Sequence, residues 1–145
     1  MSVTADDLQR IATDVWRHLL DQEVVAATVP VTGELTACVR LAGAFSGSVV
    51  LIAPRSVAVR AATAMFGQPA ATVDAAAARD VFGELANIIA GHVKSLVAAP
   101  SQLALPEIVE GTAHCAARCE LRVLVECTMT GPDGAFTLQV LQSEA

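Results

Sequence analysis

The stretch DVFGELANIIAG, residues 80–91, decides how this chain folds. Its apolar side chains recur every three or four residues, the pattern of an amphipathic α-helix, and they predict a helix from residue 75 to about residue 97. Asp74 is a good N-cap for this helix, and Pro100 ends it. One broad face should be buried. It carries Val81, Phe82, Leu85, Ile88, Ile89, Val93 and Leu96.

The opposite side of the same helix carries a narrow polar stripe. The polar stripe consists of Asp80, Glu84, Asn87, Gly91, Lys94 and Ser95. Spacing alone is typical of an ordinary solvated helix face. However, Asn is a middling-to-poor helix former, and Gly costs about 1 kcal/mol in a helix interior. Because Gly83, Asn87 and Gly91 occur together, we predict that the helix surface beside Glu84 and Asn87 is bare enough for another protein to approach closely. Glu84 and Asn87 themselves project together, one turn apart.

Outward from this helix, the patterns predict a mixed chain. Before it we expect a helix, three strands and a second helix, at residues 5–21, 24–31, 34–41, 47–53 and 54–66. After it, residues 105–111 form a connector. Three further strands are predicted at residues 112–117, 120–129 and 135–142, the last two joined by a turn at 131–134.

The two halves of the chain follow the same order, a helix and then three strands. Residues 13–21 can be set over residues 79–87, which aligns an Asp, a Val, an aromatic residue and a Leu. We therefore predict an α+β fold of pseudo-duplicated α-β-β-β halves, with a mainly antiparallel sheet packed against long helices. The halves span about residues 4–67 and 74–142 of a single domain, 1–145.

Composition and charge exclude several classes of protein. The chain is 54% hydrophobic, but 28 of its 145 residues are alanine. It has 9 basic and 15 acidic residues, for a net charge of -6, so we expect no nucleic-acid partner. No uncharged run reaches the roughly 20 residues that span a bilayer, and no secretory signal starts the sequence. The sequence therefore predicts a cytoplasmic protein without a membrane partner.

Cysteine and histidine residues are interpreted as structural. Without a signal peptide, the four cysteines (Cys38, Cys115, Cys119 and Cys127) are expected to be reduced and to act as small hydrophobes. His114, Cys115 and Cys119 could ligate zinc, but their spacing is tight and no fourth ligand is evident, so we predict no metal site. His92 falls within the apolar arc of the long helix and is expected to be buried or half-buried.

Several stretches together carry a family resemblance. Residues 80–91, followed by Lys94-Ser95 and by LPEIVEG at 105–111, resemble the CheX group of the CheC/CheX/FliY chemotaxis phosphatases. The segments FSGSVVL at 45–51 and AMFG at 64–67 also look like that group. A bare Glu-x-x-Asn is common, but the extended pattern is fairly specific, and the resemblance covers about residues 4–142.

The resemblance implies a phosphatase that acts on the aspartyl-phosphate of a CheY-like response regulator. In that family the glutamate, here Glu84, pairs with a lysine of the receiver, and the asparagine, here Asn87, holds the hydrolytic water in line with the phosphate. The receiver would supply Mg²⁺, and we expect no cofactor of the chain's own. Four neighbouring residues are assigned to partner binding: Asp80, Gly83, Gly91 and Lys94.

The resemblance also bears on assembly and on alternatives. CheC and FliY proteins carry the motif on two helices, whereas CheX proteins carry it on one and pair as homodimers. Here the first-helix equivalents are His18 and Asp21, so we predict one site per chain and a homodimer. Residues 135–141 are the most apolar candidate for a shared sheet edge. The alternative function is a non-catalytic module of the same fold that docks on a receiver or motor-type partner; a small-molecule or metal-binding domain is less favoured.

Overall fold

A computed structural model describes residues 3–111 and 121–143 of the chain. Its α-helices are α1 (Ala5–Val15), α2 (Arg55–Phe66) and α3 (Ala75–Lys94). A π-helical turn, Trp16–Leu20, continues α1, and a 3-10 turn, Ala70–Thr72, precedes α3. The strands are β1 (Val25–Ala26), β2 (Leu35–Gly43), β3 (Gly47–Ala53), β4 (Ser101–Leu103), β5 (Glu107–Glu110), β6 (Leu121–Gly131) and β7 (Gly134–Ser143).

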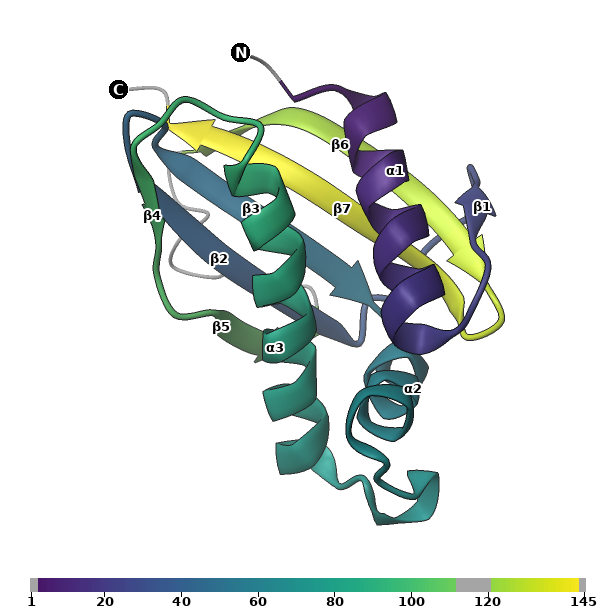
Figure 1. Cartoon of the computed structure of the whole chain (residues 1–145). Helices are drawn as coiled ribbons and strands as arrows, with labels where there is room; N and C mark the ends of the chain where they lie inside the picture. The colour runs from purple at the N-terminus through teal and green to yellow at the C-terminus, as the bar shows by residue number, and fades with distance from the viewer. Residues whose placement is uncertain (1–2, 112–120, 144–145) are drawn as a thin grey trace.

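All of these strands belong to one antiparallel sheet. The order across it is β1-β6-β7-β3-β2-β4, and β5 pairs with β2 beside β4. Helices α1 and α3 lie on the same face, α1 over the β6–β7 side and α3 over the β2–β3 side (Figure 1). Helix α2 lies at one end of the sheet, next to α3. The predicted α+β class, with a mainly antiparallel sheet packed against long helices, is confirmed.

The two halves occupy matching places in the sheet. Exchanging β1, β2 and β3 with β4, β6 and β7 leaves the strand order unchanged, with β3 and β7 paired at the centre. Each helix lies over the long strands of the other half, because α1 precedes β1–β3 and covers the β6–β7 side, while α3 precedes β4, β6 and β7 and covers the β2–β3 side. A duplication would produce this arrangement, but descent of the two halves from one repeated unit stays a prediction.

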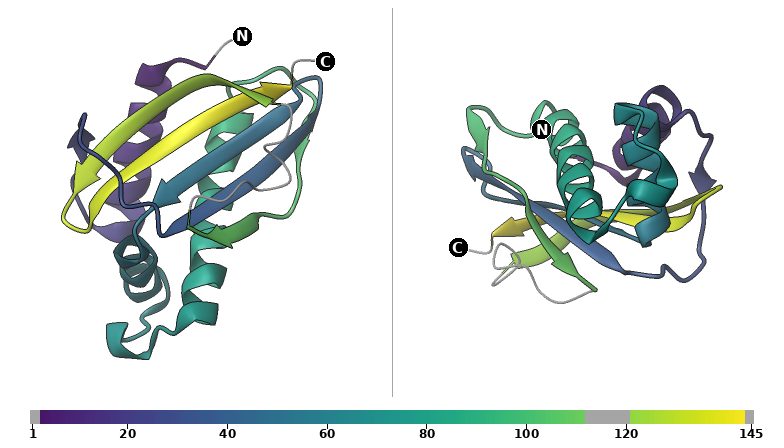
Figure 2. Two further views of the ribbon diagram at one scale, coloured as in Figure 1. Left: turned by 180° about the vertical axis from the view of Figure 1, so that it is seen from behind. Right: turned by 90° about the horizontal axis from the view of Figure 1, so that it is seen from below.

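The core lies between the helices and the covered face of the sheet, as the view along the sheet in Figure 2 shows. Trp16 and Phe136 stack at its α1 side, with ring centroids 3.9 Å apart and planes inclined by 3°. On the other side, Phe82, Leu85 and Ile89 of α3 are fully buried. This packing holds α3 by one face and leaves its opposite face free of the sheet.

Local sequence signals set the helix ends. The Thr4 hydroxyl accepts from the Asp7 N–H at 3.1 Å and the Thr4 N–H donates to Asp7, a capping box that lowers the pKa of the Asp7 carboxyl. Asp74 caps α3 by accepting from the Ala77 N–H at 2.8 Å. Gly67 ends α2 with φ 68, a left-handed conformation that favours glycine.

Two predicted segments differ from the structure. Only Val25–Ala26 of the predicted strand 24–31 pairs with β6. The chain must then leave that edge to reach β2, which lies four positions away across the sheet. Conversely, the connector expected at residues 105–111 contains β5, whose residues pair with β2 from Leu35 to Cys38. The strand predicted at residues 112–117 lies outside the described residues.

The strand predicted as a shared edge is interior, so that prediction is wrong. β7 pairs with β3 on one side and with β6 on the other. The apolar character of residues 135–141 reflects this central place, where Phe136, Leu138 and Val140 pack into the core. On that side the outermost long strand is β6, and among the described residues its outer edge pairs only with β1, at Met129 and Thr130.

Candidate functional site

The polar stripe lies on the solvent side of α3. Asp80, Glu84, Gly91 and Lys94 are exposed, and Asn87 is half-buried. The residues expected on the buried face are buried or, for Ile88 and Leu96, partly buried against the core. Glu84 and Asn87 therefore lie one turn apart on a helix whose other face is fixed by the core.

The C-terminal connection of α3 returns to the middle of the helix. The guanidinium of Arg79 donates to the carbonyl oxygen of Ile108 at 2.9 Å, which ties β5 to α3. Gly83 allows this approach, since a Cβ at that position would lie 2.9 Å from Ile108 Cδ1 and 3.3 Å from Pro106 Cγ. The bare flank predicted at Gly83 is wrong, because the chain's own Pro106 and Ile108 cover it. At Gly91 a Cβ would meet nothing within 4 Å.

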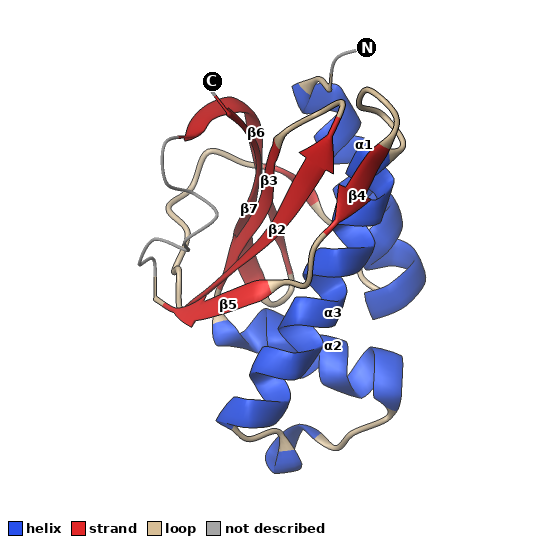
Figure 3. Ribbon diagram, turned by 90° about the vertical axis from the view of Figure 1, so that its left-hand side faces the viewer, coloured by secondary structure: helices blue, strands red, loops and turns tan. Residues whose placement is uncertain are grey.

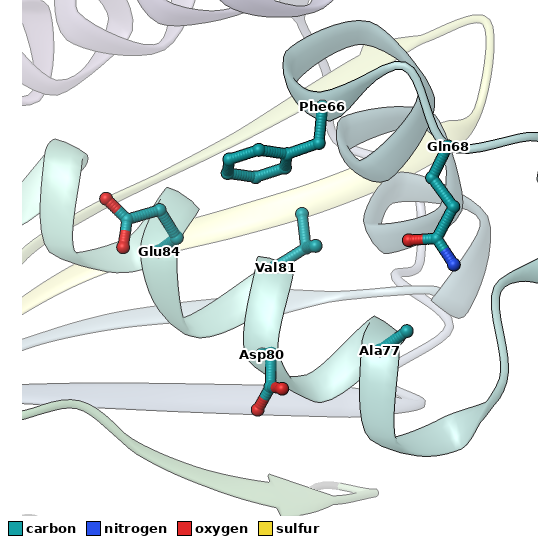
Figure 4. Close-up of a pocket in the computed structure, with 6 residues that line it drawn as sticks. All are labelled: Phe66, Gln68, Ala77, Asp80, Val81 and Glu84. Atoms are coloured by element: carbon teal, nitrogen blue, oxygen red, sulfur yellow. The ribbon is translucent and has the colours of Figure 1, made fainter.

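Two open grooves run along α3, one on each side of Asp80 and Glu84. The first has a volume of about 360 Å³, and it is shown in Figure 4; Phe66, Gln68, Ala77, Asp80, Val81 and Glu84 line it. The second, of about 410 Å³, is lined by Arg79, Asp80, Gly83, Glu84, Leu105, Pro106 and Ile108. Asp80 and Glu84 thus form a ridge between two hollows.

The polar groups of this site have no partners inside the described part of the chain. Among residues 3–111 and 121–143, the side chains of Asp80, Glu84, Asn87 and Lys94 make no hydrogen bond or ion pair. The guanidinium of Arg79, which lines the same groove as Asp80 and Glu84, is already bound to a backbone carbonyl. Two carboxylates, a carboxamide and an ammonium group are therefore available to a partner.

These residue types permit positioning rather than covalent catalysis. A carboxamide offers one acceptor and two donors without charge, so Asn87 can hold a water molecule without acting as its base. A carboxylate such as Glu84 binds a basic side chain by a charge-assisted hydrogen bond. Within the described residues, neither Asp80 nor Glu84 makes a hydrogen bond to a hydroxyl, thiol or imidazole that could serve as a nucleophile.

His92 is exposed, so its predicted burial is wrong. It follows Ile88 by one turn, at the margin of the apolar arc that faces α1. Helices α1 and α3 leave a shallow groove there, lined by Asp14, Val15, His18, Leu19, Ile88 and His92. The ring of His92 therefore stays in solvent instead of packing into the core.

The first helix does not reproduce the stripe of α3. His18 is exposed, and its Nδ1 lies 2.8 Å from the Asp14 carbonyl oxygen. Asp21 lies beyond the helix, at a cap residue with φ 54. The two positions aligned with Glu84 and Asn87 thus have different side chains and only one of them is helical.

The cysteines that the structure describes are buried. They are Cys38 and Cys127, and burial raises the pKa of the Cys127 thiol to about 11. His114, Cys115 and Cys119, considered as zinc ligands, lie outside the described residues. Elsewhere in the described ranges, no three His, Cys, Asp or Glu side chains are grouped as metal ligands would be.

Two residues that carry no motif in the sequence lie at this site in the structure. Phe66 and Leu105 come from the segments 64–67 and 105–111, and they are 60% and 91% exposed. A large apolar residue directly before a helix-ending Gly, or directly before Pro, is the only signal in the sequence that could have marked them. Their place beside α3 depends on the tertiary fold.

Fold and site together define a class: an α+β domain whose long helix displays an acid–amide pair on its solvent-facing side. A family model described as chemotaxis phosphatase CheX matches residues 35–129. The chain therefore belongs to the CheX family.

Solved structures of chemotaxis proteins share the fold. CheX from Vibrio vulnificus is 18% identical with a TM-score of 0.75, covering 94% of this chain and 93% of that one. CheX from Desulfovibrio desulfuricans is 20% identical with a TM-score of 0.72, covering 95% and 98%. The Borrelia burgdorferi complex of CheX, CheY, BeF3 and Mg²⁺ gives 17% identity and a TM-score of 0.64, covering 94% and 95%.

No curated protein sequence matches the chain. In the part of the chain that the structure describes, no helix has the length and apolar character needed to cross a membrane.

Proposed function

We propose that this protein removes the phosphoryl group from the aspartyl-phosphate of a CheY-like response regulator. The observation that carries the proposal is the pair Glu84 and Asn87, one turn apart on the outer face of α3 and unpaired within the described residues. Membership of the CheX family supports it, as does the solved complex of a Borrelia burgdorferi CheX with CheY, BeF3 and Mg²⁺.

In the proposed reaction, Glu84 binds a lysine of the receiver and so aligns α3 with its active site. Asn87 then enters that site and holds a water molecule opposite the scissile bond. The water oxygen bonds to phosphorus while the bond between phosphorus and the aspartyl oxygen breaks. The receiver regains a free carboxylate, and both water protons leave with inorganic phosphate.

Positioning can account for much of the acceleration, because an acyl phosphate already has a good leaving group. A hundredfold gain needs only about 2.7 kcal/mol. The Mg²⁺ of the receiver neutralises charge on the phosphoryl group, so we propose no cofactor for this chain. Asp80 and Lys94 support receiver binding. The cytoplasmic location stays a prediction.

Phosphate release from a phosphorylated CheY-type receiver tests this function. With wild-type protein the receiver should lose phosphate faster than alone. Asn87→Ala should lower kcat about a hundredfold and leave receiver binding intact, since only the positioned water molecule is lost. Glu84→Gln keeps the shape of the side chain but removes its charge, and it should raise KM.

Gln102→Ala is the matched control, because it truncates an exposed carboxamide on β4, outside the grooves. An unchanged receiver half-life with wild-type protein would refute the enzymatic proposal and favour a docking module. If Asn87→Ala were as active as wild type, the role of that residue would be wrong.

We also propose a homodimer, with β6 in place of β7 as the shared edge. Within the described residues, β1 covers only one end of β6. Val123 and Leu124, near its other end, are 48% and 36% exposed. An open apolar edge is a ready site for pairing with a second strand. Light scattering should give about twice the 15.0 kDa of one chain, and Leu124→Lys should shift it toward the monomer; a monomer at micromolar concentration would refute the dimer.

A further inference from the structure

Large apolar side chains are exposed at two places on the described surface. One group lies along the β1–β6 edge and the loop after β1: Val25, Val29, Val123 and Leu124. The other consists of Phe66 and Leu105, the two bulky residues that flank the ridge of α3. Exposed large apolar side chains that flank unpaired polar groups are typical of a protein-binding site.

Phe66 is displayed from a fixed helix end. It is the last residue of α2, and the following Gly67 closes the helix with N–H bonds to the carbonyl oxygens of Ala62 and Thr63. The Thr63 hydroxyl donates to the Gln68 carbonyl oxygen at 2.8 Å, which holds the chain just beyond the cap. In Figure 4 the ring of Phe66 extends over the groove, on the same side as Val81 and Glu84.

Leu105 is held from both sides of its short connector. Before it, the Ala104 N–H donates to the Arg40 carbonyl oxygen at 2.9 Å. After it, β5 pairs with β2, and Arg79 ties Ile108 to α3. Figure 3 shows β4 and β5 running beside α3 at this edge of the sheet. Leu105 therefore projects into solvent from a backbone that is fixed by hydrogen bonds.

Rigid apolar anchors cost little entropy to immobilise, and they contribute most when neighbouring contacts exclude water. The ridge between the two anchors offers two carboxylates, Asp80 and Glu84, that no cation neutralises within the described residues. The matching occupant is a folded surface with basic side chains at its centre and apolar side chains on both flanks. Because Glu84 lines both grooves, a partner that reaches Glu84 meets Phe66 on one side and Leu105 on the other.

We propose that Phe66 and Leu105 are the two docking anchors for the receiver, and that they set its affinity while Glu84 and Asn87 serve orientation and chemistry. This inference rests on the proposed function. It adds that the receiver's basic active-site rim is bordered by apolar side chains on both flanks.

The test measures binding separately from phosphate release. The probe is a panel of CheY-type receivers from the same genome, each with Mg²⁺ and BeF3, titrated with wild-type protein and variants. Phe66→Ser and Leu105→Ser should each raise Kd about tenfold. In phosphate release both should raise KM by a similar factor and leave kcat unchanged. Leu105→Met should restore binding because it keeps the apolar volume.

Val29→Ser is the matched control, because Val29 is an exposed apolar residue that is not among those lining either groove, and the Kd of this variant should equal that of wild type. Leu105→Ser should keep the wild-type melting temperature, since Leu105 is 91% exposed and buries almost nothing; the melting temperature of Phe66→Ser, at a residue 60% exposed, is measured alongside it to separate lost binding from lost stability. The anchors are supported if receiver binding depends on both Phe66 and Leu105. A wild-type protein that binds in this way but does not accelerate dephosphorylation would refute only the enzymatic proposal. The two anchors are refuted if no receiver binds the wild-type protein. They are also refuted if wild-type protein accelerates dephosphorylation and both serine variants have the same Kd and KM as wild type.

Discussion

Gly91→Ala should make the protein more stable and less active, and this combination would distinguish a functional glycine from a neutral one. Gly91 lies in the last turn of α3, where a Cβ would meet nothing within 4 Å. The added methyl group therefore reduces the backbone entropy of the unfolded chain at no packing cost in the free protein. Near a helix end we expect about 0.5 kcal/mol, the low end of the range for Gly to Ala.

For a domain of this size, 0.5 kcal/mol corresponds to a rise in melting temperature of about 2 °C. Differential scanning calorimetry of wild type and variant checks this value. The same methyl group would stand in the path of a receiver that packs closely on the polar stripe. KM for the phosphorylated receiver should therefore rise several-fold, while kcat should change little.

Gly83→Ala is the matched control on the same helix. It also gains helix propensity, but its Cβ would lie 2.9 Å from Ile108 Cδ1, so that side chain must shift. The net gain in stability should fall below the roughly 1 kcal/mol expected for a mid-helix Gly to Ala change. If Gly91→Ala stabilises the protein and leaves KM unchanged, no partner approaches that part of α3. If it destabilises the protein, the surroundings of Gly91 are not open.

Three further predictions concern the fold. Asp74→Ala should lower the free energy of unfolding by about 1 kcal/mol in urea titrations, because the α3 N-cap bond to the Ala77 N–H is lost; an unchanged midpoint would mean that water replaces the cap. Trp16→Ala should cost about 3–5 kcal/mol, measured by circular dichroism, because it removes the buried ring stacked on Phe136. The free energy of unfolding should fall as pH rises above about 9, the pKa of the thiol in the unfolded chain. The reason is that the Cys127 thiol, with a pKa of about 11 in the folded protein, stays protonated there while the unfolded chain loses the proton. Alkylation of Cys127 at pH 8, followed by mass spectrometry, should be slow in the native protein and fast in urea.

Elements defined by local patterns could be predicted from the sequence. The apolar spacing of α3, the Asp74 cap and Gly67 after α2 act through neighbouring residues, and the structure places these features where the sequence puts them. The stripe with Glu84 and Asn87 faces solvent for the same reason, because helical geometry alone fixes which residues share a face.

Features set by distant partners could not be predicted. β7 reads as an apolar strand whether it is central or at an edge, and only its pairing with β3 and β6 decides between them. His92 shares the apolar arc by angle, yet the groove between α1 and α3 leaves it in solvent. Gly83 was predicted to leave a bare flank. The local pattern does not show that Pro106 and Ile108 return to α3 and cover it, because this is a tertiary contact.

The charge of the site constrains which residue can approach a phosphoryl group. Asp80 and Glu84 would repel phosphate, and the chain as a whole has a net charge of -6. A docked receiver must therefore place its own cations against the ridge. Asn87, one turn from Glu84, is the neighbouring residue whose uncharged carboxamide can approach the phosphate without charge repulsion. On this argument Asn87→Asp should lose activity although it keeps the side-chain shape, because a third carboxylate would be brought toward the phosphate. Equal rates for Asn87→Asp and wild type would contradict this division of roles.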